Sequence, residues 1–238
     1  MMKFSIDDSV SELFPGLTIG VLSGSIGMAR PSLEASIAEL RAEALDRFHA
    51  FALDTANMTA NPNIAAWRQA YQRFGAKAKT YKPTHEALAR RLLKEGVWPN
   101  INPIVDIYLT NQVAHLLPHG GYDANAITGV VRLSVSEGGE KFDPLGGGEE
   151  FTSPREVVYR DDVRILTRRW NYRDCDAAKI TRATEKFIMF IESPSEEIPE
   201  ESVEDASRDL AERYGRCFEG EFRYSLVRAS TGAHDFEF

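Results

Sequence analysis

The segment N-I-N-P-I-V-D-I-Y-L-T-N-Q-V-A-H-L-L-P-H-G-G-Y-D, from Asn100 to Asp123, decides the fold of this 238-residue chain. Residues 104–117 are apolar on nearly every side, which is typical of a helix buried at the centre of a domain. Pro118 ends that helix because proline has no N–H for the helical ladder. Gly120 and Gly121 follow, and glycine backbone can turn sharply or approach a ligand closely. The segment predicts a buried central helix that forms the floor of a pocket.

The hydrophobic period changes along the rest of the chain. Helical spacing and helix-end signals cover residues 31–51, 61–74, 83–95 and 202–214, the last with Ser202 and Asp205 as a capping box. Strand-like runs cover residues 3–6, 17–22, 131–135, 156–159, 163–166, 187–191 and 222–227. Ser23-Gly24-Ser25 is expected to turn the chain after the second of these strands. This order of elements indicates an α+β domain. We expect an N-terminal β/helical extension (1–60) packed on the main domain (61–230), then a frayed tail (231–238).

Composition narrows the classes of function. The net charge is −8 and the pI is near 5.3, which disfavours sequence-independent binding of long nucleic acid, so no DNA partner is expected. Cys175 and Cys217 make neither a disulfide framework nor a zinc site, and no two histidines have metal-ligand spacing, so we expect no metal and no cofactor. No apolar signal core and no long apolar run occurs. We therefore expect a cytoplasmic protein with no membrane partner, and the oligomeric state stays open.

The first candidate for chemistry is the block from Arg168 to Thr184. It concentrates cations in an acidic chain and interleaves them with Trp170 and Tyr172. Cations beside aromatic rings suit phosphate contact and base stacking. The structural alternative is a buried polar turn, with Arg173 paired to Asp174, Trp170 in the core and Thr181 as a cap.

Two further candidates are polar groups at the ends of apolar elements. Glu192 follows the apolar run 187–191, and a carboxylate there must be solvated, paired or used in a site. Asn102 and Asp106 lie at the start of the central helix, where a structural role for Asp106 is favoured.

Several of these motifs resemble a known family. Arg90-Arg91-Leu92-Leu93, Gly96, the run I-N-P-I-V-D-I and the ending P-x-G-G-x-D are similar to the B3/B4 domain. That domain occurs in the β chain of bacterial phenylalanyl-tRNA synthetase, where it hydrolyses mischarged tyrosine from tRNA, and also in free-standing proteins. The resemblance runs from about Trp67 to Ser193. The N-Y-R-D…K-I-T block resembles the free-standing members.

The resemblance implies an α+β fold of the B3/B4 type, with the central helix packed on a β layer and a pocket between them. It places Glu192 where the editing domain has a glutamate that reads the tyrosine hydroxyl, and Asn102 at a pocket asparagine. The functional histidine of the editing domain falls on Gly120 here, and His119 lies one residue earlier. This departure favours a module that keeps the pocket without the editing histidine.

We therefore expect the chain to bind the aminoacyl end of an aminoacyl-tRNA, or a similar aminoacyl compound. If it is an enzyme, it is an aminoacyl-tRNA deacylase, an ester hydrolase for trans-editing. The alternative is a non-catalytic RNA- or small-molecule-binding module. The predicted catalytic residues are Asn102, His119, Gly120 and Gly121, with backbone N–H groups near the glycines holding the oxyanion. The predicted substrate-binding residues are Glu192, Asp106, Trp170, Asn171, Arg169, Arg173, Asp174, Lys179 and Thr181.

Overall fold

The computed structural model describes residues 2–229 and 234–237, which form two β-sheets and a group of packed helices. The helices are α1 (Asp8–Leu13), α2 (Leu33–Ala50), α3 (Pro62–Arg73), α4 (Thr84–Glu95), α5 (Pro103–His115) and α6 (Glu200–Cys217), with 3-10 turns at Met58–Ala60 and Ala124–Ala126. The strands are β1 (Met2–Ile6), β2 (Thr18–Ala29), β3 (His119–Asp123), β4 (Val130–Val135), β5 (Lys141–Phe142), β6 (Glu150–Phe151), β7 (Val157–Arg160), β8 (Ile165–Arg168), β9 (Arg173–Asp174), β10 (Lys186–Ser193), β11 (Phe218–Arg228) and β12 (His234–Phe236). The α+β expectation is confirmed.

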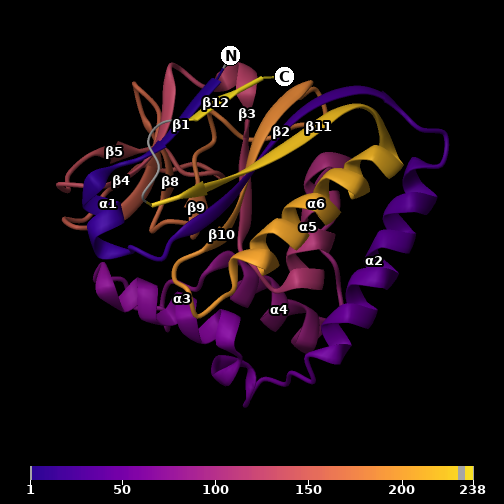
Figure 1. Cartoon of the computed structure of the whole chain (residues 1–238), viewed down its shortest axis with the longest axis horizontal. Coiled ribbons are helices and arrows are strands. Elements are labelled where there is room, and N and C mark those ends of the chain that lie inside the picture. Colours follow the sequence, from indigo (N-terminus) through magenta and orange to yellow (C-terminus); the bar gives the residue numbers. More distant parts are fainter. Residues whose placement is uncertain (1, 230–233, 238) are drawn as a thin grey trace.

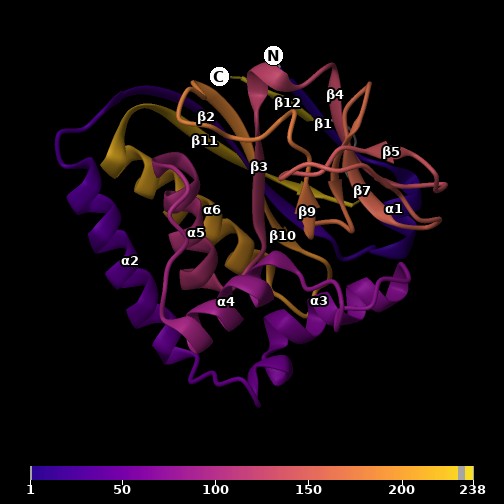
Figure 2. The same ribbon diagram turned by 180° about the vertical axis from the view of Figure 1, so that it is seen from behind.

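The strands form two main sheets and one small hairpin. One has the strand order β12-β1-β4-β7-β8-β9, the other β11-β2-β10-β3, and β5 and β6 form a separate hairpin. Helices α2, α5 and α6 lie on one side of the four-stranded sheet, and the six-stranded sheet lies on the other (Figure 1). Seen from behind, α3 and α4 run along the lower end of both layers (Figure 2). Among the described residues, no helix has the length and apolar character to span a membrane.

The central helix is confirmed as α5. The Asn102 side chain caps it by accepting a hydrogen bond from the Val105 N–H at 3.0 Å, and Pro103 occupies the first turn, where its missing N–H costs nothing. Leu116, with φ of 51°, ends the helix in the left-handed region two residues before Pro118. Helix α5 packs against α2 and α6, and its residues are buried almost throughout. Because the helix is enclosed in this way, both of its ends are fixed beside the sheets.

The turn expected at Ser23-Gly24-Ser25 is wrong, the turn is excluded as one of the two uses expected of Gly120-Gly121, and one helix starts earlier than expected. Strand β2 continues through Ser23-Gly24-Ser25. Gly24 lies opposite Phe187, and a Cβ there would come within 2.2 Å of the ring, so glycine at this position allows the two strands to pack closely. Gly120 and Gly121 belong to strand β3 and have no positive φ. These glycines therefore allow close strand packing or leave open space rather than making a turn. Helix α6 begins at Glu200, before the expected capping box.

The C-terminal segment also differs from the expectation of a frayed tail. Strand β12 pairs antiparallel with β1, with Met2 opposite Phe236, and the Phe236 side chain is buried. The two ends of the chain therefore lie side by side, as Figures 1 and 2 both show. Residues 230–233 and 238 of the expected tail lie outside the described residues. The domain boundary near residue 60 remains a prediction.

Candidate functional site

Glu192 is a buried carboxylate near the end of β10, between β2 and β3. Only 1% of its surface is exposed, so it is not a surface residue at a strand end. Burial raises the pKa of Glu192 to about 7, since a low-dielectric environment disfavours the charged form. Within the described part of the chain, no lysine or arginine forms a hydrogen bond with Glu192. The group is therefore placed to change its ionisation near neutral pH.

Three neutral donors hold the Glu192 carboxylate. The Tyr159 hydroxyl and the Trp170 Nε1–H, the latter at 2.8 Å, donate to Oε1, and the Asn171 amide donates to Oε2 at 2.9 Å. The Tyr71 hydroxyl in turn donates to the Asn171 side-chain oxygen at 2.9 Å. These donors fix the orientation of the carboxylate without neutralising its charge.

The loop that supplies two of these donors is strained. Arg169 and Trp170 have φ values of 48° and 65°, which non-glycine residues rarely adopt. Such residues cost about 1–3 kcal/mol each and cluster at functional sites. The conformation is held by the Trp170 N–H, which donates to the Val157 carbonyl at 2.7 Å. It turns the indole and the Asn171 amide inward toward Glu192.

A second carboxylate, Asp174, lines the same region. The Thr167 hydroxyl donates to Asp174 Oδ1 at 2.6 Å, and the Tyr122 hydroxyl lies 2.5 Å from Thr167 Oγ1. Because the Thr167 proton goes to the carboxylate, Tyr122 donates to Thr167. Burial raises the pKa of Asp174. The site therefore contains two carboxyl groups, both of which burial makes harder to ionise.

These groups surround a cavity of about 60 Å³, called here the acidic cavity. Its lining consists of Thr84, Tyr108, His119, Gly120, Tyr122, Tyr159, Thr167, Trp170, Asn171, Tyr172, Asp174, Phe190 and Glu192. Among the described residues, this lining includes two carboxyl groups and no lysine or arginine. A polar space of this size holds water or one small polar group of a ligand. The chemistry favours a cation or a hydrogen-bond donor.

His119 lines the cavity, but both of its ring nitrogens already have partners. Nδ1 lies 2.9 Å from the Leu117 carbonyl oxygen, and Nε2 lies 2.5 Å from Asn111 Oδ1. Burial lowers the pKa of His119 to about 3, so the ring is neutral and carries one N–H. That N–H is on Nδ1, because a carbonyl oxygen can only accept. Asn111 Oδ1 can also only accept, so Nε2 accepts from Asn111 once this amide is turned over, which brings the otherwise unpaired Nδ2 to the ring.

The other residues predicted to be catalytic are engaged in the backbone or directed elsewhere. Gly120 lies opposite Phe190 in the antiparallel pairing of β3 with β10. Hydrogen-bonded residue pairs alternate along such a pairing, and Glu192 with Pro118, two residues further on, is one of them. Gly120 and Phe190 are therefore the next hydrogen-bonded pair, and the Gly120 N–H points to β10. A Cβ at Gly120 would meet no atom within 4 Å, whereas a Cβ at Gly121 would meet the Ile188 carbonyl at 2.6 Å. Gly121 therefore serves strand packing, and Gly120 leaves room at the cavity.

Asn102 and Asp106 serve the start of α5 and do not line the acidic cavity. The Asn102 amide caps the helix and donates to the Ile180 carbonyl at 3.2 Å. Asp106 accepts from the Ile101 N–H and pairs with Arg41 at 3.1 Å. Both side chains thus have structural partners.

Most cations of the Arg168–Thr184 block are paired within the protein. Buried Arg168 bonds Glu156 and Glu150, Arg173 also bonds Glu150, and Lys179 pairs with Asp176. Thr181 closes a local turn by accepting from the Ala183 N–H. Trp170 is fully buried. Arg169 differs, because its guanidinium stacks on the Tyr81 ring at 3.8 Å and no carboxylate partner is found for it in the described part of the chain.

Sequence reasoning missed much of the cavity wall. The missed lining residues are Thr84, Tyr108, Tyr122, Tyr159 and Thr167, and Tyr71 is missed as the hydrogen-bond partner of Asn171. Tyrosine in a strand or in a helical stripe is ordinary core composition, so no local signal distinguishes these residues. The pairing of β3 with β10 and of β7 with β8 brings Tyr122, Tyr159 and Thr167 together, and α4 and α5 add Thr84 and Tyr108.

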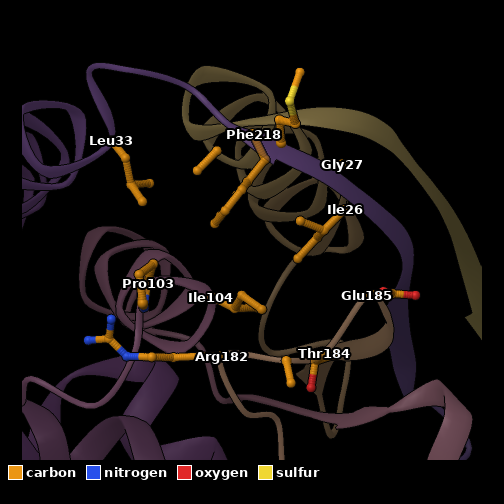
Figure 3. Close-up of a pocket in the computed structure, with 12 residues that line it drawn as sticks. Ile26, Gly27, Leu33, Pro103, Ile104, Arg182, Thr184, Glu185 and Phe218 are labelled. Carbon is orange, nitrogen blue, oxygen red and sulfur yellow. The ribbon is translucent and has the colours of Figure 1, made fainter.

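A larger cavity, of about 600 Å³, lies between the end of β2 and the starts of α2 and α5 (Figure 3). Its lining is mainly apolar, and Arg182 and Glu185 lie on different sides of it (Figure 3). None of the residues predicted to be catalytic or substrate-binding lines it, although Arg182, Ala183 and Thr184 of the Arg168–Thr184 block do. The Thr184 hydroxyl there already donates to Asp123 at 2.7 Å. We place the candidate site in the acidic cavity, where convergent polar groups and shifted pKa values coincide.

Comparison with known proteins gives one family match. A family model for the B3/4 domain matches residues 66–216. No curated protein sequence matches the chain. Among solved structures, an N-terminal fragment of the phenylalanyl-tRNA synthetase beta-subunit from Pyrococcus horikoshii is 11% identical, with a TM-score of 0.47 over 92% of this chain and 49% of that one. The chain thus spans about half the length of that fragment.

Proposed function

This chain belongs to the B3/4 domain family, and we propose that its acidic cavity binds the aminoacyl end of an aminoacyl-tRNA. The observation that carries the proposal is the cavity lining, in which Glu192 and Asp174 face a small polar space without a lysine or arginine among the described residues. An aminoacyl ester carries an α-ammonium group. Two carboxylates around a partly dry space suit that cation.

The size of the cavity limits what enters it. A space of about 60 Å³ takes the ammonium group or another small polar end, so the bulk of the amino acid lies toward the mouth. Tyr108 and Tyr172 line this space and offer ring surface to the rest of the ligand. The terminal ribose then remains outside the cavity.

A second candidate function, ester hydrolysis, is favoured by the pKa of Glu192. A carboxyl group with a pKa of about 7 can act as a general base at neutral pH. Water would attack the ester carbonyl carbon while its proton moves to Glu192. The bond from that carbon to the ribose oxygen would then break, and the ribose oxygen would recover the proton from Glu192. The products are the free amino acid and the uncharged tRNA.

The first test compares the binding of uncharged tRNA with that of tRNAs carrying 3′-amide-linked amino acids, which cannot hydrolyse. We expect at least one acylated tRNA to bind about tenfold more tightly than the uncharged form. Glu192→Gln and Asp174→Asn should remove that difference, since each removes a carboxylate from the cavity. Asp176→Asn is the matched control, because Asp176 is exposed and pairs with Lys179. Equal affinity for acylated and uncharged tRNA across the panel would refute the proposal.

The second test measures deacylation of ester-linked aminoacyl-tRNAs by the same variants. Release that is faster than the spontaneous rate, and is lost in Glu192→Gln, would establish hydrolysis. Tighter binding without release would leave recognition as the function. The departure at Gly120 suggests a third variant, Gly120→His, which places a histidine where the editing domain has one.

A further inference from the structure

A stacked arrangement of three side chains lies beside the acidic cavity. The Arg169 guanidinium carbon lies 3.8 Å from the Tyr81 ring centroid and 5.5 Å from that of Tyr172. The two rings meet edge-on with centroids 5.2 Å apart. All three side chains are half-buried, so the group is ordered yet reachable. Stacking fixes the plane of the guanidinium, and its N–H groups have no carboxylate partner among the residues described.

The segment leading to Tyr81 adds further positive charge. Lys77, Lys79 and Lys82 lie in a run of seven residues, 76–82, that has no carboxylate. The N–H groups of Thr80 and Tyr81 both donate to the Lys77 carbonyl at 2.8 Å, so the run is wound into a tight turn. Exposed Lys77 and Lys79 line a cavity of about 380 Å³. No carboxylate pairs with either ammonium group within residues 2–229 and 234–237.

This basic turn is continuous with the candidate site. Tyr172 belongs both to the stack and to the lining of the acidic cavity. Thr84, two residues after Lys82, lines the cavity as well. The stack therefore adjoins the cavity through Tyr172, and the lysines adjoin the stack through Tyr81.

We infer that Arg169, Tyr81 and Tyr172, together with Lys77, Lys79 and Lys82, form a docking surface for the last nucleotides of a single-stranded RNA 3′ end. The inference rests on the proposed function, which brings an ester-linked ribose to the cavity mouth. The guanidinium contacts a phosphate, the exposed ring surface receives a base, and the lysines follow the preceding phosphates. This surface is called the 3′-end platform.

The balance of charge favours RNA as the occupant. The chain carries a net charge of −8, so most of its surface repels a polyanion and a local cationic turn determines where one can approach. Aromatic rings combined with cations suit bases and phosphates together, whereas an acidic peptide would pair with Arg169 and the lysines and leave the ring surface unused. We therefore assign the platform to RNA.

The test uses RNA that carries no amino acid, so that its result does not depend on occupancy of the acidic cavity. The probe is a single-stranded RNA of twelve nucleotides that ends in CCA, with its affinity measured between 50 and 200 mM salt. The double variant Lys77→Ala/Lys79→Ala should weaken binding about threefold to tenfold. It should also flatten the slope of log Kd against log salt by about 1.4, because each neutralised phosphate on a single strand contributes about 0.7.

Ring stacking is tested separately from charge. Tyr81→Ala should weaken binding about tenfold, since stacking on an aromatic side chain contributes strongly for each base. Tyr81→Phe retains the ring and should bind like the natural chain. Binding of free amino acid amides should stay the same in all of these variants, which shows that the cavity is intact.

The matched control is Lys94→Ala/Lys186→Ala, which removes the same charge from exposed lysines at the end of α4 and the start of β10. The inference is overturned if this control weakens RNA binding as much as the platform variants do, or if the platform variants have no effect. The same RNA blocked by a 3′-phosphate should bind less well, and equal affinity would also overturn a 3′-end site. Failure of the proposed function has a different signature, in which acylation changes no affinity while uncharged RNA still binds at the platform.

Discussion

At the scale of single residues, Glu192 makes the stability of the protein depend on pH. Its pKa rises from 4.5 to about 7 on folding, so the folded state keeps a proton that the unfolded chain releases between these values. The folded protein is therefore favoured at low pH, and this contribution is lost as pH rises through about 7. The shift corresponds to about 3 kcal/mol in the free energy of unfolding.

The matching measurement is urea unfolding of the natural chain and of Glu192→Gln at pH 5 and pH 8. We expect the natural chain to lose stability between these values by more than the variant does, because glutamine does not ionise. The difference between the two proteins removes the contributions of all other titrating groups. Parallel pH profiles would show that Glu192 is already ionised at pH 5.

Gly24 provides a second prediction at this scale. A Cβ there would come within 2.2 Å of the Phe187 ring, so Gly24→Ala should destabilise the protein by about 1–3 kcal/mol through overpacking. Gly120→Ala is the control, because no atom lies within 4 Å of its Cβ position. Denaturant midpoints of the two variants test this directly. An equal loss in both would show that the contact with the Phe187 ring is not the cause.

The sequence identified individual polar residues better than their partners. Glu192 is a sequence candidate because a carboxylate after an apolar run must be solvated, paired or used in a site, and in the structure it lines the cavity. Its donors Tyr159 and Trp170 could not be assigned, since each lies more than twenty residues away and only the sheets bring them together. The sequence allows two interpretations of the Arg168–Thr184 block, a phosphate-binding surface or a buried polar turn. In the structure most of its cations are paired with carboxylates of the protein.

At the scale of elements, the hairpin of β7 and β8 depends on a buried ion pair. Arg168 bonds Glu156 with two nitrogens at 2.8 and 2.7 Å and reaches Glu150 at 2.7 Å. Arg168→Met would leave the buried Glu156 carboxylate without a cation, which costs about 3–5 kcal/mol. Arg173→Met removes a half-exposed partner of Glu150 and should cost less than about 1 kcal/mol.

Thermal unfolding of Arg168→Met and Arg173→Met compares the contributions of the buried and the half-exposed arginine to stability. A large loss in Arg168→Met alone would confirm that this arginine stabilises the fold through Glu156 and Glu150. Similar small losses in both variants would show that Glu156 is hydrated or protonated once its partner is gone.

Helices were predicted more accurately than turns, for a physical reason. Proline at a helix start and glycine at a helix end act locally, as at Pro62 and Gly96, and both signals gave the right boundaries. Glycine between apolar runs has two uses, a positive φ or close contact between chains. These uses look the same in sequence, so the turns expected at Gly24 and at Gly120-Gly121 are strands in the structure.

At the scale of the whole molecule, pairings between distant segments complete the sheets. Strand β1 pairs in parallel with β4, more than a hundred residues later, and antiparallel with β12 at the other end of the chain. The short N-terminal strand was predicted from its alternation, but no local pattern specifies a partner at such a separation. The expected frayed tail was wrong for this reason, since His234–Phe236 is too short to read as a strand by itself.

Substitutions on the buried and on the exposed face of β12 test how much its pairing with β1 stabilises the fold. Phe236 is 5% exposed and packs in the core, whereas Asp235 points outward and approaches Lys3 at 3.7 Å. Phe236→Ala should lower the free energy of unfolding by about 3–5 kcal/mol, because it removes a buried ring from the core. Asp235→Ala removes only an exposed ion pair and should change it by less than about 0.5 kcal/mol. If Phe236→Ala proved as mild as Asp235→Ala, β12 would contribute little to the folded state, and β1 would be the effective edge of its sheet.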